Sequence, residues 1–320
     1  MHLIIPYAAS HTFMDPAAWL GLKLPHLQTL LSLLQRQKAL QDSEDLALHM
    51  PHERLLAEAL GWAQDSAALP WAAWHSAQQG QPSAKPQAWM TPCHWQVGMD
   101  QVVMLDPASL FLSDDESQQL LQAMQPFLQE DGLQVTWHSA LAWHAQGDML
   151  AEMPTASLDR VIGQNVKPWM PDSPSAHHAA RPLQRLQSEM QMLLYNHPVN
   201  DARDARKQYT VNAFWMHGAG TLPVTGPVSA PPSVTVSTVL RSAALHGQAQ
   251  AWQQAWQQLD ATAVADLLQH VKTTGQGTLS LCSEHTAHTY MAGPAAWHQR
   301  ISRLFNKPSP ATALQTLIAS

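Results

Sequence analysis

Charged side chains are scarce in this sequence. Asp, Glu, Lys and Arg make up 13% of its 320 residues, and the formal net charge is −7. A surface that binds nucleic acid needs clustered Lys and Arg to neutralise the phosphates. The 17 Lys and Arg residues form no such stripe, so the composition gives no support for a nucleic-acid partner.

Cysteine is also rare, and long apolar runs are missing. Cys93 and Cys282 are the only cysteines, which argues against a disulfide framework and favours a reducing compartment. No stretch approaches the roughly 20 apolar residues that cross a membrane. Residues 1–7 have no basic segment ahead of their apolar run and do not resemble a signal peptide. We therefore expect a cytoplasmic protein without a membrane segment.

Hydrophobic residues, in contrast, make up 45% of the chain, enough to fill a complete core. Leucines at helical spacing predict a helix over 25–39, and a capping box at 113–116 opens another that ends at Gly132. Pro294 is placed to begin a helix that reaches 305. Short apolar or alternating runs predict strands at 3–7, 101–105, 133–137, 210–216 and 277–283. Strands that alternate with helices indicate an α/β fold.

The most informative stretch lies between residues 197 and 220. It reads His-Pro-Val-Asn-Asp-Ala-Arg at 197–203 and Asn-Ala-Phe-Trp-Met-His-Gly-Ala-Gly at 212–220. This pattern resembles the archaeal-type cofactor-independent phosphoglycerate mutases, members of the alkaline-phosphatase-like superfamily. Weaker similarity extends back to residue 1. In its length and in the sequence of residues 186–212, the chain is also similar to a shorter bacterial group labelled phosphoglycerate mutase or RpfE-type regulatory protein.

The resemblance implies an architecture of two domains. An α/β core, with an alkaline-phosphatase-like sheet and helices on both of its faces, would come from residues 1–85 and 205–320. A smaller α+β domain, residues 86–204, would be inserted between the two core segments. A chain of 320 residues is long enough for two domains.

The resemblance also implies a set of ligand-binding residues in the informative stretch, possible contacts for a phosphorylated metabolite: His197, Asn200, Arg203, Asn212 and Trp215. Arg203, Arg206 and Lys207 together would suit an anionic ligand. The alternative is that these three cations belong to a solvated loop after a helix, and the sequence does not separate the two readings.

The catalytic machinery of the family is largely missing. Its enzymes move a phosphoryl group through a serine, with two divalent metals that clamp the attacking and leaving oxygens. The first metal ligand should be an Asp directly after the first strand, where this chain has Pro6 and Tyr7. Asp15 lies too far along to replace it, and no serine stands in the expected context. We assign no catalytic residue and expect no cofactor.

A rearranged metal site is the alternative. Asp266 and His270 have the Asp-x-x-x-His spacing of the family, and Glu284, His285 and His288 follow a predicted strand. Together they would bind Mn or Zn. The simpler interpretation of Asp266 and His270 is an exposed pair beside a leucine stripe, because they lie within an apolar helical pattern.

Three functions remain open. The first is a non-catalytic regulatory or binding protein on a degenerate mutase fold, with a phosphorylated metabolite or a protein as its partner. The second is a metal-dependent phosphoglycerate mutase or phosphohydrolase with the rearranged ligands. The third is a partner subunit that assembles through an exposed tryptophan patch at Trp71 and Trp74 or at Trp252 and Trp256, although most tryptophans are core residues. We favour the first.

Overall fold

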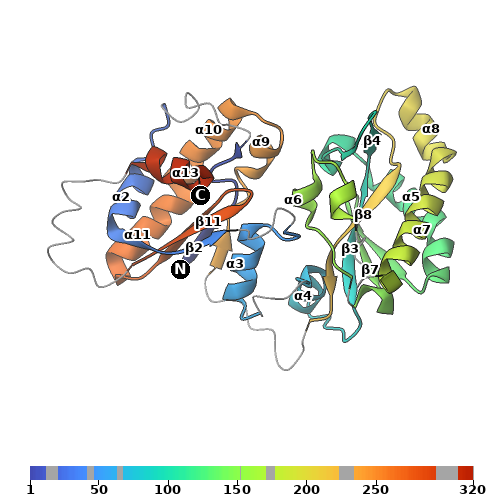
Figure 1. The fold of residues 1–320 in the computed structure, drawn as a ribbon, viewed down its shortest axis with the longest axis horizontal. Coiled ribbons are helices and arrows are strands. Elements are labelled where there is room, and N and C mark those ends of the chain that lie inside the picture. The colour runs from blue at the N-terminus through green and yellow to red at the C-terminus, as the bar shows by residue number, and fades with distance from the viewer. Residues whose placement is uncertain are drawn as a thin grey trace. The chain divides into compact units, whose positions relative to one another are not determined.

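The protein folds into two compact units. The computed structural model describes residues 1–11, 21–41, 47–62, 68–151, 153–170, 177–222, 234–292 and 309–319, without the side chains of 41 and 177–181. Unit 1 comprises residues 1–64 and 231–320, and unit 2 comprises residues 65–230 (Figure 1). The expected core segments ended at 85 and restarted at 205, whereas residues 65–85 and 205–230 belong to unit 2.

Unit 1 is built on a five-stranded mixed sheet with the order β2-β11-β10-β1-β9. Its strands are β1 (His2–Ile5), β2 (Leu34–Gln41), β9 (Val234–Val236), β10 (Thr278–Cys282) and β11 (Thr286–Ala292). β1 runs parallel to β9 and β10, while β11 and β2 are antiparallel to their neighbours. Strands from the two ends of the chain therefore lie side by side at the centre of this sheet.

Helices cover both faces of the unit 1 sheet. They are α2 (Pro25–Leu33), α3 (Pro51–Ala59), α9 (Arg241–Leu245), α10 (Ala249–Leu259), α11 (Ala265–Thr274) and α13 (Pro310–Ala319). Leu3 and Ile5 on β1 share a core cluster with residues of α2, α10, α11 and α13, whereas Ile4 packs with Leu55 of α3. The alternation along β1 thus sends successive side chains to opposite cores. The predicted α/β class is confirmed.

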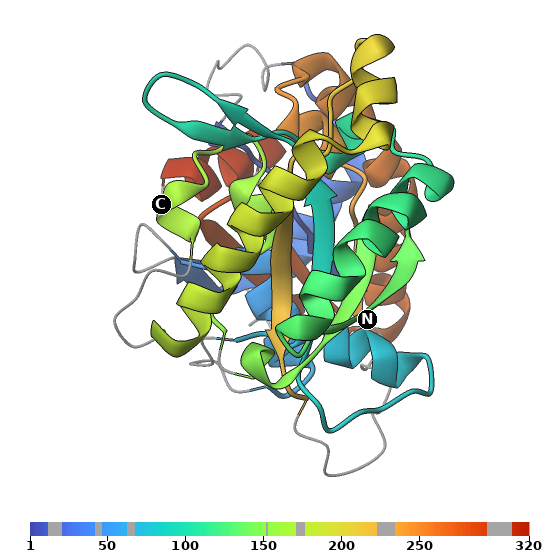
Figure 2. The ribbon, with the colours of Figure 1, turned by 90° about the vertical axis from the view of Figure 1, so that its right-hand side faces the viewer.

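Unit 2 has a four-stranded antiparallel sheet with the order β6-β7-β3-β8. Its strands are β3 (Gln87–Cys93), β6 (Gln134–Ser139), β7 (Ala142–Gln146) and β8 (Ala213–Gly220), and a separate hairpin joins β4 (Trp95–Val97) to β5 (Val102–Met104). Its longer helices are α4 (Trp71–Gln78), α5 (Asp114–Glu130), α7 (His177–Tyr195) and α8 (Pro198–Ala205), and α6 (Leu158–Val161) is short. In Figure 2, α5 and α7 lie over one face of the sheet.

Two expectations about local structure need correction. The helix predicted over 25–39 ends at Leu33, and residues 34–41 form β2 instead, since β2 pairs along its length with β11. The tryptophan patch at Trp252 and Trp256 is wrong, because both side chains are fully buried. Trp71 and Trp74 are half-buried, with ring centroids 5.9 Å apart. The predicted helix at 294–305 and Asp15 lie outside the described residues.

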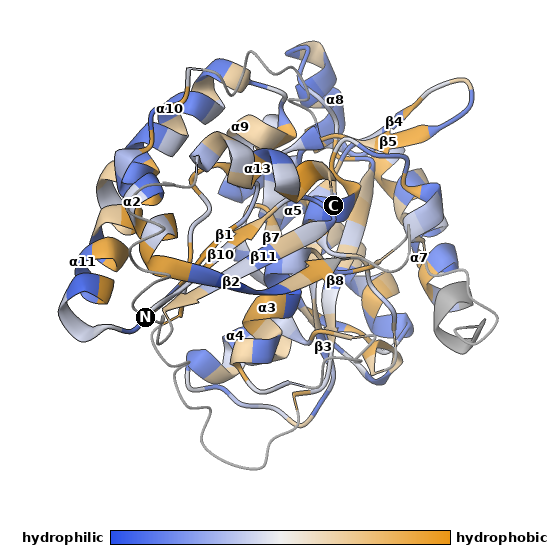
Figure 3. Ribbon diagram, turned by 60° about the vertical axis from the view of Figure 1, so that its left-hand side comes forward, coloured by the Kyte–Doolittle hydropathy of each residue, from blue (hydrophilic) through white to orange (hydrophobic). Residues whose placement is uncertain are grey.

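No helix in the described ranges combines the length and the apolar character that crossing a membrane requires. Figure 3 shows instead that the helices of unit 1 carry both hydrophilic and hydrophobic residues. Their buried positions recur at helical spacing, as with Leu27, Leu30 and Leu31 on α2. Each helix therefore turns one apolar stripe toward the sheet.

A π-helical turn between α10 and α11 supplies the N-terminal cap of α2. Asp260, the first residue of this turn, is 3% exposed. Its carboxylate accepts hydrogen bonds from the backbone N–H groups of His26, at 3.1 Å, and Leu27, at 2.7 Å. Leu24, the residue in the capping position of α2, makes no side-chain cap bond. Asp260, from a distant part of the chain, therefore provides the cap that Leu24 does not.

We predict that Asp260→Ala lowers the free energy of unfolding by about 1–3 kcal/mol, since two helix N–H groups lose their acceptor. Urea denaturation of both proteins measures the difference. Asp266→Ala, at an exposed position on α11, is the matched control and should change the stability by less than about 0.5 kcal/mol. Equal losses in the two variants would contradict the capping role.

Candidate functional site

The strongest candidate site lies in unit 1, at the carboxyl ends of β1 and β10. Their parallel register pairs Ile5 with Leu281, so the segments that follow both strands leave from the same edge. The backbone N–H of Ala8 donates to the carbonyl of Cys282 at 2.8 Å and fixes the two segments together. Ligands of open α/β sheets bind at this edge.

Glu284 is the centre of a hydrogen-bonded group at this edge. Ser10 Oγ donates to Glu284 Oε1 at 2.5 Å, and His11 Nδ1 lies 3.0 Å from Glu284 Oε2. The backbone N–H of His11 donates to the same oxygen at 3.3 Å. The ring of His285 meets that of His11 edge-on, with centroids 5.6 Å apart. We call Ser10, His11, Glu284 and His285 the Glu284 cluster.

Opposite charges stabilise each other within the Glu284 cluster. Burial by itself raises the pKa of Glu284, but the hydrogen bonds from His11 and Ser10 outweigh it and hold this pKa below the usual value. The hydrogen bond to Glu284 raises the pKa of His11, against the opposing effect of burial. The two shifts favour a carboxylate paired with an imidazolium.

The tryptophans of α10 hold the segment that leads into the cluster. Trp252 Nε1 donates to the carbonyl of Tyr7 at 2.9 Å, and Trp256 Nε1 donates to the carbonyl of Ala8 at 3.0 Å. Tyr7 adopts a positive φ of 55°, which a non-glycine residue seldom does. The two buried indoles thus fix a strained turn that delivers Ser10 and His11 to Glu284.

The geometry of Ser10 is not that of an activated nucleophile. Such a serine needs a hydrogen bond to a base and access to its substrate. Ser10 donates a hydrogen bond to the carboxylate of Glu284, but Ser10 is fully buried and lacks access to a substrate. His11 also donates to this carboxylate. Glu284 therefore binds both side chains, and the hydroxyl of Ser10 is not exposed to solvent.

The residues described at this edge do not fit a two-metal centre. Such a centre needs several carboxylate and imidazole donors that converge on two cations. Glu284 is the carboxylate of the cluster, and both of its oxygens already accept hydrogen bonds. Within the described ranges, no group of three His, Cys, Asp or Glu residues is arranged to hold a metal ion.

The five alternative metal donors lie in different environments. Asp266 is exposed and His270 half-buried on α11, whose buried side is formed by Leu267, Leu268 and Val271. His288 is buried on β11, and its pKa is lowered by burial and then by the charge of Arg36. Glu284 and His285 belong to the Glu284 cluster. The structure therefore does not gather these five residues around one cation.

The predicted ligand-binding residues of unit 2 make structural contacts. Asn200 Nδ2 donates to the carbonyls of Leu194, at 2.8 Å, and Val211, at 2.7 Å, and its Oδ1 accepts from the N–H of Val211 at 2.9 Å. Asn212 binds both backbone groups of Trp95, at 2.7 and 2.9 Å. These two amides tie neighbouring segments of backbone together.

His197 and Arg203 also serve the fold. His197 Nδ1 accepts from the N–H of Val199 at 3.2 Å, which caps α8. Arg203 is fully buried, and it donates to Glu116 at 2.8 Å, to the carbonyl of Tyr209 at 2.8 Å and to the carbonyl of Leu110. These partners account for the position of Arg203 without a ligand, and binding of a metabolite by these residues stays a prediction.

Glu116 pairs with two of the three cations that were candidates for an anion site. Arg206 Nη2 lies 2.5 Å from Glu116 Oε1, beside the contact of Arg203 with Oε2. Burial raises the pKa of Glu116, but the N–H of Ser113 and the charges of Arg203 and Arg206 reverse this effect and lower it. One carboxylate thus engages both guanidinium groups within the protein.

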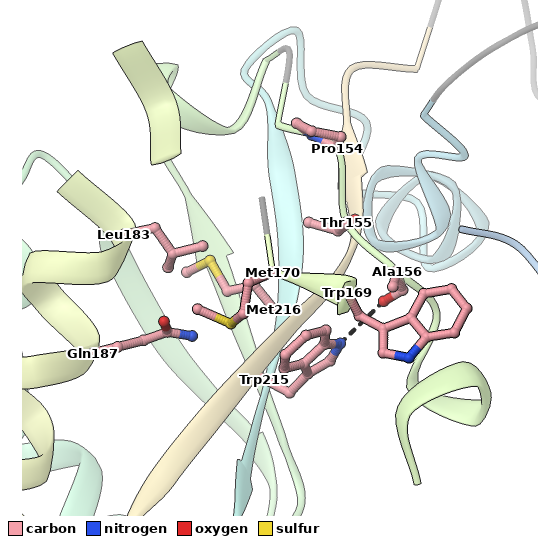
Figure 4. Close-up of a pocket in the computed structure, with 9 residues that line it drawn as sticks. All are labelled: Pro154, Thr155, Ala156, Trp169, Met170, Leu183, Gln187, Trp215 and Met216. Atoms are coloured by element: carbon pink, nitrogen blue, oxygen red, sulfur yellow. Dashed lines mark hydrogen bonds between the residues drawn. The ribbon is translucent and has the colours of Figure 1, made fainter. Parts of the chain in front are cut away.

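Trp215 lines a shallow hollow in unit 2 (Figure 4). Its indole N–H donates to the carbonyl of Ala156 at 3.0 Å, and the amide of the buried Gln187 points into the hollow. The hollow measures about 220 Å³ with its open mouth, and the remaining lining residues are Pro154, Thr155, Trp169, Met170, Leu183 and Met216. This lining contains no cation for a phosphate group.

Sequence reasoning did not identify Ser10 and His11. They follow the first strand by five and six positions, and the rule that functional groups gather at carboxyl ends of parallel strands is the signal that points to them. Applying it requires knowledge that β1 pairs with β10, and this pairing joins residues from opposite ends of the chain.

Comparisons with known proteins show structural similarity to two solved structures. No protein-family model and no curated protein matches the sequence. The fold is similar to that of a cofactor-independent phosphoglycerate mutase from Thermoplasma acidophilum, at 12% identity and a TM-score of 0.36, covering 92% of this chain and 90% of the other. It is also similar to the PH0037 protein from Pyrococcus horikoshii, at 11% identity and a TM-score of 0.48, covering 94% and 92%. At these values neither likeness indicates an activity.

The Glu284 cluster predicts a stability that depends on pH. The raised pKa of His11 stabilises the fold below its ordinary pKa, and this contribution is lost as pH rises through the folded value. The lowered pKa of Glu284 stabilises the fold above its ordinary pKa, and this is lost as pH falls through the folded value. Both contributions are complete only between the two ordinary values, about pH 4.5 to 6.5.

We therefore expect Glu284→Gln to cost about 1–3 kcal/mol of unfolding free energy within that window and less on either side. Denaturant titrations over a pH series measure this difference. Glu58→Gln is the matched control, since Glu58 forms an exposed ion pair with Lys38 at 2.9 Å, and such a pair is worth less than about 1 kcal/mol. A loss in Glu284→Gln that is flat with pH would contradict the proposed pairing.

Arg203→Met should lower the unfolding free energy by about 3 kcal/mol or more, since it removes one partner of a buried ion pair. Arg206→Gln breaks the exposed contact to the same carboxylate and should cost less than about 1 kcal/mol. Thermal and urea denaturation report both changes. A stable Arg203→Met protein would contradict a structural role for Arg203.

Proposed function

We propose that this protein is a non-catalytic binding or regulatory protein on a phosphoglycerate-mutase-like fold. The observation that carries the proposal is the internal hydrogen bonding of the Glu284 cluster. A carboxylate in this place on an α/β sheet is where a metal ligand or general base would stand. Here Ser10 and His11 bind both of its oxygens.

The residues before the cluster support the same conclusion. Tyr7 follows the first strand in the place where the resemblance implies a metal-binding Asp, and its side chain is 2% exposed. A phenol in this position does not supply the carboxylate that holds a divalent cation in phosphoryl-transfer sites. The turn at Tyr7 is instead used to position Ser10 and His11 for the internal bonds.

A protein partner suits unit 2 better than a phosphorylated metabolite. The guanidinium groups of Arg203 and Arg206 both bind Glu116, and the hollow beside Trp215 has no cationic lining. Recognition of phosphate by a protein ordinarily uses Arg or Lys with free hydrogen-bond donors. The RpfE-type group that the sequence resembles carries a regulatory label, which is consistent with this proposal.

The test combines a mutase assay with metal analysis. The purified full-length protein is supplied with Mn²⁺ or Zn²⁺ and 3-phosphoglycerate, beside an active mutase as positive control. We expect no turnover above the protein-free blank, no stoichiometric metal, and the same result for Glu284→Ala. Stoichiometric metal with turnover that Glu284→Ala abolishes would establish the metal-dependent alternative and refute the proposal.

A further inference from the structure

Three histidines surround one tryptophan in unit 2. His75 comes from α4, His138 from β6 and His144 from β7, and Trp89 of β3 lies among them. The ring centroid of Trp89 is 5.1 Å from that of His75, 5.2 Å from His138 and 5.5 Å from His144. His75 and His138 are 5.2 Å apart. We call these four residues the histidine cluster.

The histidine cluster lies where α4 packs against the sheet. Ser76 Oγ on α4 donates to Gln87 Oε1 at 2.7 Å, and His144 Nε2 lies 2.7 Å from the same oxygen. The start of α4 sits directly on β8, because a Cβ added to Gly218 would lie 3.0 Å from the Cβ of Trp71. Neutral hydrogen bonds and ring contacts therefore hold this helix.

The elements that surround these rings supply no formal charge to balance a proton. The five elements around the cluster, α4, β3, β6, β7 and β8, contain no Asp, Glu, Lys or Arg. Their other titratable groups are His217 on β8, which binds Thr91 Oγ1 at 3.0 Å, and the buried Cys93 on β3. His75 Nε2 is buried without a hydrogen-bond partner in the described structure.

Protonation in this place is correspondingly unfavourable. Burial, followed by the proximity of His138, lowers the pKa of His75. Burial, followed by His75 and His138, lowers the pKa of His144. A lowered pKa in the folded state means that stability is complete above the ordinary value of about 6.5 and is lost as pH falls below it.

We propose that the histidine cluster is an acid-sensitive latch that holds α4 on the sheet when its imidazoles are neutral and releases α4 when they take up protons. His138 is exposed to solvent, and its ring centroid lies 5.2 Å from those of both Trp89 and His75. A proton on His75 would enter a ring whose Nε2 is buried, next to the His138 imidazole, whose charge opposes it. Movement of α4 into water relieves both penalties.

The latch is independent of the Glu284 cluster, because its residues all belong to unit 2. Release of α4 would uncover apolar surface on Trp89 and on the buried residues Ala72 and Ala73. A surface that opens only in acid is a means by which pH can control a binding protein. The latch would therefore make binding at this surface depend on pH, whichever partner binds there.

Hydrogen–deuterium exchange of the full-length protein tests the latch. Exchange is followed in peptides from α4 and α5 at about pH 7.5 and about pH 5.5, with times scaled for the intrinsic effect of pH. We expect the protection of α4 to fall by about tenfold or more in acid, reversibly, while that of α5 stays constant. Equal protection of α4 at both values would refute the latch.

Variants distinguish the latch from general acid unfolding. His75→Gln cannot take up the buried proton, so α4 should stay protected in acid. His138→Gln removes the like charge that opposes protonation of His75 and should shift the transition to lower pH; since His138 is exposed, this variant also serves if His75→Gln does not fold. His270→Gln, on α11 of unit 1, is the matched control and should behave as the unmodified protein. A full acid response in both His75→Gln and His138→Gln would overturn the proposal.

Discussion

The parallel pairing of β1 with β10 is the constraint on which unit 1 depends. It aligns His2–Ile5 with Thr278–Leu281 at the centre of the sheet, so the chain closes its first unit only after more than 270 residues have been made. Such distant contacts carry a large entropic cost and are stable only with extensive burial. β1 meets this need because Leu3, Ile4 and Ile5 are fully buried between the two helical layers.

In both units, polar side chains form hydrogen bonds and ion pairs with other groups of the same unit. In unit 1, Glu284 accepts from Ser10 and His11, and Asp260 caps α2. In unit 2, Glu116 binds Arg203 while it also completes the capping box of α5 with Ser113. These hydrogen bonds join one part of the fold to another. The proposed non-catalytic role rests on this use of Glu284.

The sequence predicted those features whose signals are local. The capping box at 113–116 and the stop at Gly132 delimit α5 correctly, and the strand at 277–283 is β10 within one residue at each end. α2 was predicted too long because leucine spacing continues into Leu34, and pairing with β11 decides the conformation there. The grouping of residues in the Glu284 and histidine clusters was not predicted for the same reason, although Glu284 and His285 were predicted individually as metal donors. Their members come from separate elements, and only the register of the strands brings them together.

β2 has a consequence for the behaviour of the protein in concentrated solution. It is a terminal strand of the unit 1 sheet, and Arg36 and Lys38 lie within it. A second copy of the protein that added its own β2 to this border would bring the Arg36 and Lys38 side chains of the two copies close together. β9, at the opposite border, spans three of the described residues. Charge on one border and a short strand on the other both disfavour the growth of this sheet into intermolecular fibres.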